Sequence, residues 1–410
     1  MDADKMNIEH RIAMVSPYPA PGKDHLKTSG LGHYTKNFLS GLSSEQKAKI
    51  IVLAEKEEGP ERYVENGITV WRCWERGNFL LPWQIWRAIR QVRPELVHFQ
   101  HEFFAFDGTK TIALFILLLL ALRLARIKTV VTMHHVLELS TLDPDFVRGN
   151  GIYMPVSLVR AGVWLMTKLI VAFSTAIIVH EHSFKELLKK QFKSDVRKVN
   201  VIFHGAMGQP RRPKSQEEAK RLLGLEGKKV ILFFGYLTRY KGLEILIESF
   251  RHVLPLDRNC ILVIAGGETV RLASEWRYQS FLRSLYQMAR EISPERIIFT
   301  GYVPDEEVPL YFSAADLFVL PYTISISSSG PLSLAIEYET PTIMSTVFAE
   351  VTKDHLALFE RDPLSLAEKI KECLEEPQVY QAVRANCKNL KAERRWDVVA
   401  AKTWALYERL

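Results

Sequence analysis

Short apolar runs alternate along the chain with longer segments in which apolar residues recur every three or four positions. Runs of four to six apolar residues indicate buried strands, and the longer periodic segments indicate helices. The predicted helices include Leu31–Leu42, Pro82–Val92, Thr109–Ala125, Val156–Phe173 and Val398–Leu410. The predicted strands are Arg11–Ser16, Ile50–Ala54, Val70–Cys73, Leu96–Phe99, Thr129–Met133, Ala176–Val179, Val199–Phe203, Val230–Phe234, Ile261–Ala265, Arg296–Thr300, Leu317–Leu320 and Thr342–Ser345. This alternation predicts parallel sheets covered by helices on both faces.

A polar stretch with two prolines, Gly208–Glu218, interrupts the alternation and indicates a linker. We therefore expect an α/β protein of two doubly wound, Rossmann-like domains that face a central cleft, where ligands meet the carboxyl ends of the strands. The expected division is residues 1–207 for the first domain, 208–225 for the linker and 226–395 for the second domain. The last helix, 396–410, is expected to cross back to the first domain.

Two segments are more apolar than a surface helix requires. Ile112–Leu122 is almost wholly aliphatic but is too short to span a bilayer, which needs about 20 residues. Val156–Phe173 is interrupted by Arg160 and Lys168. We interpret both as helices buried between a sheet and its neighbours, and partial insertion into a bilayer surface is the alternative.

Composition narrows the class of protein. The 410 residues are 47% hydrophobic and 25% charged, which is typical of a soluble globular protein of two or three domains. The net charge of +7 suggests an anionic ligand or surface. Four scattered cysteines and a polar N-terminus without an apolar core favour a cytoplasmic protein without disulfides, a zinc site or a signal peptide.

The segment Phe233–Phe250 carries the clearest candidate chemistry. A buried strand ends at Gly235, a loop carries Arg239 and Lys241, and a helix opens at Gly242. Backbone N–H groups, the positive end of a helix and two cations together suit a diphosphate. The alternative is an ordinary strand-to-helix turn with a solvated arginine and lysine.

Further candidates follow other strands. Gly30 and Gly32 open a helix after the first strand, where a backbone can approach an anion closely. His134 follows the strand Thr129–Met133, and a neutral imidazole there can hydrogen-bond a sugar hydroxyl. His98 and His101 are three residues apart on an extended chain and should face opposite sides, so we expect a structural His98 and no metal pair.

Several segments together resemble the retaining glycosyltransferases of the GT-B fold, family 4. Lys241-Gly242 matches the end of the family's G-R-L-x-x-x-K-G, and the Ala314–Pro321 run A-A-D-L-F-V-L-P matches a family signature. The family's arginine directly follows its glycine, whereas this chain has Tyr236 there and Arg239 two residues before the lysine. The resemblance covers nearly the whole chain.

The resemblance implies roles for particular residues. Arg239 and Lys241 would hold the diphosphate of a nucleotide sugar, and His134 would lie near the donor sugar; these three are the candidate catalytic residues. The remaining candidate donor-binding residues are Gly30, Gly32, Gly235, Tyr302, Ser328, Ser329, Gly330 and Glu337.

One family feature is missing. The two glutamates that the family places in the E-G-F-G-L-x-x-x-E motif fall in register at Ile326 and Leu334. Glu337 lies one turn beyond Leu334 and could replace the second, or it could be a solvated helix residue. Serine hydroxyls and backbone N–H groups before Gly330 still suit an anion.

The resemblance implies a glycosyltransferase that acts on hexoses and uses a UDP- or GDP-sugar with retention and without a metal or other cofactor. The acceptor would be a glycan or a lipid-linked molecule, and no nucleic-acid partner is expected. The alternatives are a catalytically degenerate scaffold subunit, motivated by the missing glutamates, and a GT-B sugar-nucleotide epimerase.

The basic charge and the aliphatic Ile112–Leu122 also suggest that the first domain docks on an anionic membrane, at its inner face. The segment Phe184–Lys198 carries six cations beside Leu187, Leu188 and Phe192, and basic residues near such a surface contribute roughly 1 kcal/mol each. A solvated basic helix over a buried aliphatic one is the alternative.

Overall fold

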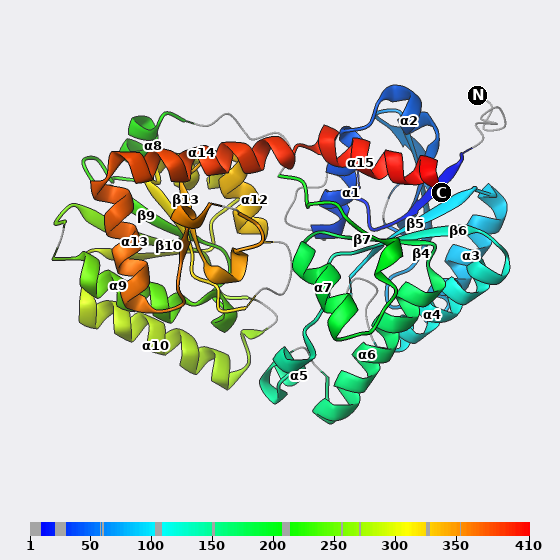
Figure 1. Ribbon diagram of the computed structural model, residues 1–410, viewed down its shortest axis with the longest axis horizontal. Helices are drawn as coiled ribbons and strands as arrows, with labels where there is room; N and C mark the ends of the chain where they lie inside the picture. The colour runs from blue at the N-terminus through cyan, green and yellow to red at the C-terminus, as the bar shows by residue number, and fades with distance from the viewer. Residues whose placement is uncertain are drawn as a thin grey trace. The chain divides into compact units, whose positions relative to one another are not determined.

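The chain forms two compact units (Figure 1). The computed structural model describes residues 10–20, 30–57, 59, 61–102, 109–149, 152–206, 214–255, 257–269, 272–324, 329–352 and 354–410. The N-terminal unit contains the residues up to Gly205 and the segment Arg395–Leu410. The C-terminal unit contains the residues between Ala206 and Arg394, apart from 326–328.

An eight-stranded sheet forms the centre of the N-terminal unit, with the strand order β3-β4-β2-β1-β5-β6-β7-β8. Its strands are β1 (Ile12–Val15), β2 (Ile50–Glu55), β3 (Arg62–Glu65), β4 (Ile68–Trp74), β5 (Leu96–His101), β6 (Lys128–Met133), β7 (Ala176–Val179) and β8 (Val199–Val201). All neighbours are parallel except the pair of β3 and β4. Every residue of β1, β2, β5 and β7 is buried, as expected of strands covered on both faces.

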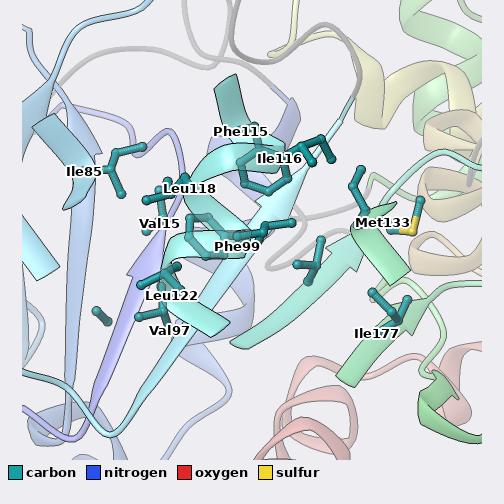
Figure 2. Close-up of a cluster of buried hydrophobic side chains, with 14 of the residues drawn as sticks. Val15, Ile85, Val97, Phe99, Phe115, Ile116, Leu118, Leu122, Met133 and Ile177 are labelled. Atoms are coloured by element: carbon teal, nitrogen blue, oxygen red, sulfur yellow. The ribbon is translucent and has the colours of Figure 1, made fainter. Parts of the chain in front are cut away.

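Helices cover both faces of this sheet. They are α1 (Gly30–Ser40), α2 (Ser44–Ala48), α3 (Leu81–Val92), α4 (Thr109–Leu124), α5 (Pro144–Gly149), α6 (Val156–Phe173), α7 (His182–Lys190) and α15 (Trp396–Arg409). On one face α3, α4, α6 and α7 share a core with the strands, and Figure 2 shows Phe115 and Leu122 of α4 beside Val97 and Phe99 of β5. On the other face α1 packs with α15, the last helix of the chain.

The expectation that Val156–Phe173 is a buried helix is wrong, because only 22% of α6 is buried. Its inner side adds Ile170 and Val171 to the core, whereas Leu158 and Leu165 are exposed. Within the described residues, α6 is the one helix that is long and apolar enough to cross a bilayer by length and composition alone. α4 is likewise buried on one side only, as Leu117 and Leu124 are exposed.

A six-stranded, wholly parallel sheet forms the centre of the C-terminal unit, with the order β11-β10-β9-β12-β13-β14. Its strands are β9 (Lys229–Phe234), β10 (Cys260–Ala265), β11 (Ile297–Gly301), β12 (Leu317–Leu320), β13 (Thr342–Ser345) and β14 (Leu358–Phe359). Its helices are α8 (Gln216–Leu222), α9 (Leu243–Val253), α10 (Trp276–Ile292), α11 (Val308–Ala314), α12 (Gly330–Glu337), α13 (Pro363–Glu375) and α14 (Pro377–Glu393). The two doubly wound sheets confirm the predicted fold class.

Asp316 explains part of the Ala314–Pro321 signature. Its Oδ2 accepts a hydrogen bond of 2.6 Å from the N–H of Val230 at the start of β9 and lies 2.7 Å from Lys220 Nζ of α8. The carboxylate thus ties β12 to its neighbouring strand and to α8. α8 falls in the range 208–225 that the sequence assigns to a linker, and it packs on α11 of the C-terminal unit. Residues 207–213 lie outside the described part of the chain.

Candidate functional site

Four loops meet at the carboxyl ends of β9, β10, β11 and β12 in the C-terminal unit. Gly235 ends β9 with φ +121°, a value that favours glycine. A Cβ at Gly266, after β10, would overlap the carbonyl oxygen of Gly235, and a Cβ at Gly267 would lie 3.1 Å from the amide nitrogen of Tyr302, after β11. The loops therefore pack backbone against backbone at this edge.

Lys241 is buried at the centre of these loops, with only 6% of the residue exposed. It ends a 3₁₀ turn, Arg239–Lys241, and the next residue, Gly242, is the N-cap of α9 and has the left-handed conformation. A Cβ at Gly242 would overlap the carbonyl oxygen of Pro321, so this turn is held tightly against the end of β12. The amide of Thr323 adds a 2.8 Å hydrogen bond to the carbonyl of Tyr240.

The Lys241 ammonium points back at Gly235. A Cβ at Gly235 would lie 2.5 Å from Lys241 Nζ, and Nζ is 5.8 Å from the centre of the Tyr322 ring. Among the described residues, no carboxylate lies within 4.0 Å of Nζ. Burial lowers the pKa of Lys241 to about 8. A buried cation without a counter-charge is costly, and an anionic ligand would offset that cost.

The first turn of α12 lies beside this lysine. A Cβ at Gly235 would be 3.2 Å from Pro331 Cγ in that turn. Ser329, at the N-cap, is 8% exposed; its Oγ accepts from the amide of Leu332 and lies 3.2 Å from the Tyr322 hydroxyl. Among the described residues, a Cβ at Gly330 would meet nothing within 4 Å, and Gly330 is exposed. Ser328 lies outside the described residues.

Lys241, Gly235, Ser329 and Gly330 thus lie together, as the sequence predicts for an anion site, with the helix dipole adding positive charge. Tyr302 lies at the same edge and is 49% exposed. Sequence reasoning did not select Tyr236, which follows Gly235 and is equally exposed at 49%. Its aromatic side chain beside a glycine turn is the signal that could have identified it.

Two predicted residues lie elsewhere in the C-terminal unit. The guanidinium of Arg239 lies 4.7 Å from the centre of the Phe281 ring of α10, so this exposed side chain rests on a neighbouring helix. Glu337 ends α12, about 10 Å along the axis from Gly330. Its carboxylate is 3.7 Å from Lys391 Nζ of α14, and burial raises its pKa. Glu337 is therefore neither solvated nor beside Lys241.

In the N-terminal unit, His134 lies at the end of β6 and is 8% exposed. Its Nε2 is 2.8 Å from Gln100 Oε1 of β5, and its Nδ1 is 3.2 Å from Nε2 of His180, after β7. The ring of Tyr34 from α1 packs edge-on at 4.6 Å. Burial, followed by the neighbouring histidines, holds the pKa of His134 well below its usual value, so the imidazole is neutral. Gln100, His180 and Tyr34 were not predicted.

The histidines of β5 face opposite sides of the sheet, as predicted. His98 Nε2 is 2.7 Å from Thr132 Oγ1 and its Nδ1 is 2.5 Å from the Tyr407 hydroxyl of α15. The His101 ring stacks on Phe115 of α4 with centroids 5.0 Å apart. His98 is thus a hydrogen-bonded structural residue. Gly30 and Gly32 form the start of α1, with Gly32 buried. Within the described ranges, no group of three or more His, Cys, Asp or Glu is arranged to hold a metal ion.

Comparisons with known proteins identify the family and the fold. Residues 28–206 match the family described as Glycosyltransferase Family 4, and residues 228–376 match Glycosyl transferases group 1. YtcC of Bacillus subtilis is 41% identical over 100 residues, 24% of each chain, and the D-inositol 3-phosphate glycosyltransferase of Corynebacterium diphtheriae is 26% identical over 234 residues. The latter match covers 54% of this chain and 52% of the relative. The chain therefore spans about a quarter of the length of YtcC and about half of the length of the inositol-phosphate enzyme.

Among solved structures, HepE from Anabaena in complex with UDP and glucose has a similar fold, with a TM-score of 0.67 at 15% identity. The similarity covers 98% of this chain and 100% of HepE. At this identity the likeness concerns the GT-B fold alone.

Proposed function

The chain belongs to the family 4 (group 1) glycosyltransferases of the GT-B fold, and from this premise we propose that it transfers a sugar from a nucleotide-diphosphate sugar to an acceptor hydroxyl, with retention and without a metal. The observation that carries the proposal is Lys241, a buried ammonium without a nearby carboxylate in the described part of the chain. It lies beside Gly235 and the first turn of α12, the arrangement that a diphosphate requires.

In the proposed reaction the bond between the anomeric carbon and the diphosphate oxygen breaks, and the electron pair leaves with the diphosphate. Negative charge develops on that oxygen, and Lys241 with the N-terminus of α12 stabilises it at the moment it appears. The acceptor hydroxyl attacks the anomeric carbon from the face that the diphosphate leaves. Its proton passes to the departing phosphate oxygen, so the linkage keeps the configuration of the donor.

The ammonium of Lys241 supplies positive charge beside the diphosphate oxygens, where a divalent cation would otherwise bind. In the proposed mechanism the leaving group therefore needs no metal ion. We propose a supporting role for Arg239, on the 3₁₀ turn before Lys241, as a second cation; its guanidinium would leave the Phe281 ring to reach the diphosphate. We propose that His134 contacts the donor sugar. Its burial keeps the imidazole neutral, and a ring nitrogen would exchange its present partner, Gln100 or His180, for a sugar hydroxyl.

UDP is the first donor nucleotide to test, because HepE, with the same fold, binds UDP. GDP is the second. The base would lie against the exposed aromatic side chains of Tyr236 and Tyr302, which border the site after β9 and β11. Stacking on such side chains contributes roughly 1–3 kcal/mol per base.

A turnover assay tests the proposal. Purified protein is incubated with a panel of UDP- and GDP-hexoses, and nucleotide release is followed with and without an acceptor mixture of glycans and lipid-linked saccharides. Release that depends on one donor and increases with an acceptor supports glycosyl transfer. Nucleotide binding without any release from the panel would identify a non-catalytic binding subunit instead.

We further propose that the protein acts in the cytoplasm, peripherally at the inner face of the membrane, on a glycan or lipid-linked acceptor. The supporting observations are the net charge of +7 and the exposed apolar helix α6.

A further inference from the structure

The outward side of α6 is apolar, contrary to the pattern of a surface helix. Leu158 and Leu165 are seven residues apart, so they share one line along the helix, and they are 56% and 50% exposed. Ala161 and Ala172 lie on the same line and are exposed too. A helix on the surface of a soluble protein normally presents polar residues to water. α6 instead presents apolar residues outward as well as inward.

The neighbouring helix α4 repeats this pattern. Leu117 and Leu124 are also seven residues apart and are 58% and 75% exposed, whereas Leu119 and Leu122 are fully buried on the inner side. α4 and α6 pack side by side on the same face of the sheet (Figure 1). Near their ends, Arg123 Nη1 of α4 donates a 2.9 Å hydrogen bond to the carbonyl of Ala172 of α6. The two outward apolar lines therefore belong to one surface.

α3 adds aromatic and basic residues to this surface, because it packs on α4. Trp83 is 62% exposed, and Arg87 and Arg90 lie on the same side, four and seven residues further along. Tryptophan and arginine are the residues that membrane proteins favour where hydrocarbon meets the polar headgroups. We call the outward sides of α3, α4 and α6 the apolar–basic face.

The charge of this face has one sign. The sequences of α3, α4 and α6 contain no aspartate or glutamate, although the chain has 47 acidic residues. Among the residues whose side chains the structure describes, their five cations are Arg87, Arg90, Arg123, Arg160 and Lys168. Cations around exposed leucines complement an anionic bilayer, and two copies of the face would instead bring like charges together.

The basic segment Phe184–Lys198 is less suited to docking than its sequence suggests. Arg197 pairs with Asp195, and Lys190 lies 3.5 Å from Glu186. Its Leu188 and Phe192 are fully buried in the core and so cannot meet lipid. The face made by α3, α4 and α6 has both features that the segment lacks, exposed leucines and cations without acidic neighbours on the same helices.

We propose that the apolar–basic face docks on an anionic lipid bilayer, with the leucines of α4 and α6 at the headgroup boundary and the cations among the headgroups. α6 does not span the bilayer, because its Thr167, Ile170 and Val171 are part of the protein interior. The inference deepens the proposed function in one respect: docking would bring the enzyme to a lipid-linked acceptor.

Vesicle co-sedimentation tests the docking. The full chain is mixed with phosphatidylcholine vesicles that contain about 30% phosphatidylglycerol, or none, at low and high salt. We expect binding to the anionic vesicles that is at least about tenfold stronger than to the neutral ones and that weakens with salt. The double variant Leu158→Glu/Leu165→Glu should lower binding at least about tenfold. It removes two apolar contacts with the lipid and places two negative charges against an anionic surface.

The matched control is Leu222→Glu/Leu364→Glu, which places the same two charges at leucines of the C-terminal unit that are 52% and 58% exposed. It should bind vesicles like the unaltered chain. Circular dichroism and light scattering accompany both variants. Equal, weak binding to both kinds of vesicle, or equal losses in the two double variants, would overturn the proposal. So would a dimer that only Leu158→Glu/Leu165→Glu dissociates, since a second copy would then cover the face.

Nucleotide binding keeps this inference separate from the proposed function. Calorimetric titration with UDP, without lipid, should give the same affinity for the unaltered chain and both double variants. If the protein bound vesicles but neither UDP nor GDP, the docking proposal would stand and the proposed donor would be contradicted. If it bound a nucleotide but no vesicles, the docking proposal alone would be contradicted.

Discussion

The ammonium of Lys241 lies so close to the backbone of Gly235 that a methyl group at Gly235 would come within 2.5 Å of Lys241 Nζ. The glycine at the end of β9 therefore makes the space that the lysine occupies. Because the lysine is buried and has no carboxylate within 4.0 Å among the described residues, its charge is available to a ligand. This pair is the centre of the proposed donor site.

Replacing Lys241 by methionine should stabilise the free protein. Burial lowers the pKa of Lys241 from 10.5 to about 8, so holding the charge inside the folded state at pH 7 costs on the order of 3 kcal/mol. Methionine has a similar length and removes that cost. We expect the melting temperature without nucleotide to rise by about 5 °C, measured by calorimetry.

Lys371→Met is the control for this prediction, because Lys371 is an exposed cation of α13. Its melting temperature should stay within about 1 °C of the unaltered chain, as is usual for surface substitutions. A Lys241→Met protein that melts below the unaltered chain would show that the ammonium is paired in the free protein and is not a vacant anion site.

Gly235→Ala should damage the donor site in two ways. The added Cβ displaces the ammonium of Lys241, and φ +121° is unfavourable for alanine. We expect a loss of about 1–3 kcal/mol in unfolding free energy and a rise in KM for the donor of about tenfold or more.

Gly227→Ala separates these two effects, because Gly227 has φ +70° but a Cβ there would meet no described residue within 4 Å. It should lose stability through the backbone alone and keep the donor KM. If both variants changed the donor KM equally, the contact between Gly235 and Lys241 would have no part in binding.

How far the sequence anticipates this site depends on the kind of evidence that each residue offers. The structure brings Gly235, Lys241, Ser329 and Gly330 together, as the order of elements implies, because strand ends in a parallel sheet meet at one edge. The two parallel sheets followed from the same alternation of apolar runs.

Side-chain partners from distant elements were beyond the sequence. Arg239 contacts Phe281, which is 42 residues away along the chain. Glu337 pairs with Lys391, which is 54 residues away. No local sequence pattern encodes contacts over such distances. The burial of α6 was also predicted wrongly. The apolar composition of α6 indicates that contact with water is unfavourable. It does not distinguish a helix covered by protein from one covered by lipid.

The buried histidines should make the protein less stable in mild acid. Burial lowers the pKa of His98 to about 3 and that of His134 well below 6.5, so the unfolded chain takes up these protons first as the pH falls. Their stability contribution is complete above pH 6.5 and is lost progressively below it, by about 2 kcal/mol for His98 at pH 5.

Thermal melts between pH 7.5 and 5 measure this loss. His98→Asn, which keeps a polar side chain beside Thr132 and Tyr407, should show a shallower decline than the unaltered chain. His252→Asn, on α9, is the control, since that substitution should leave the slope unchanged. Parallel slopes for all three proteins would exclude a buried neutral His98.

Turnover should not need a divalent cation. Lys241 and the start of α12 supply positive charge where a metal ion would otherwise bridge the diphosphate. We expect nucleotide release in EDTA within about twofold of the rate in magnesium, measured at saturating donor. Loss of turnover in EDTA that magnesium or manganese restores would show that the metal-free mechanism is wrong.

The most direct test of the account is calorimetric titration of the protein with UDP, and then GDP, in EDTA at pH 7 and pH 9. We predict one site whose affinity falls by about 1.5–3 kcal/mol in Lys241→Ala and weakens at pH 9, since Lys241, with a pKa of about 8, is then largely uncharged in the free protein. Lys371→Ala should bind like the unaltered chain. Unchanged affinity in Lys241→Ala, or no binding of either nucleotide, would contradict the assignment of this site.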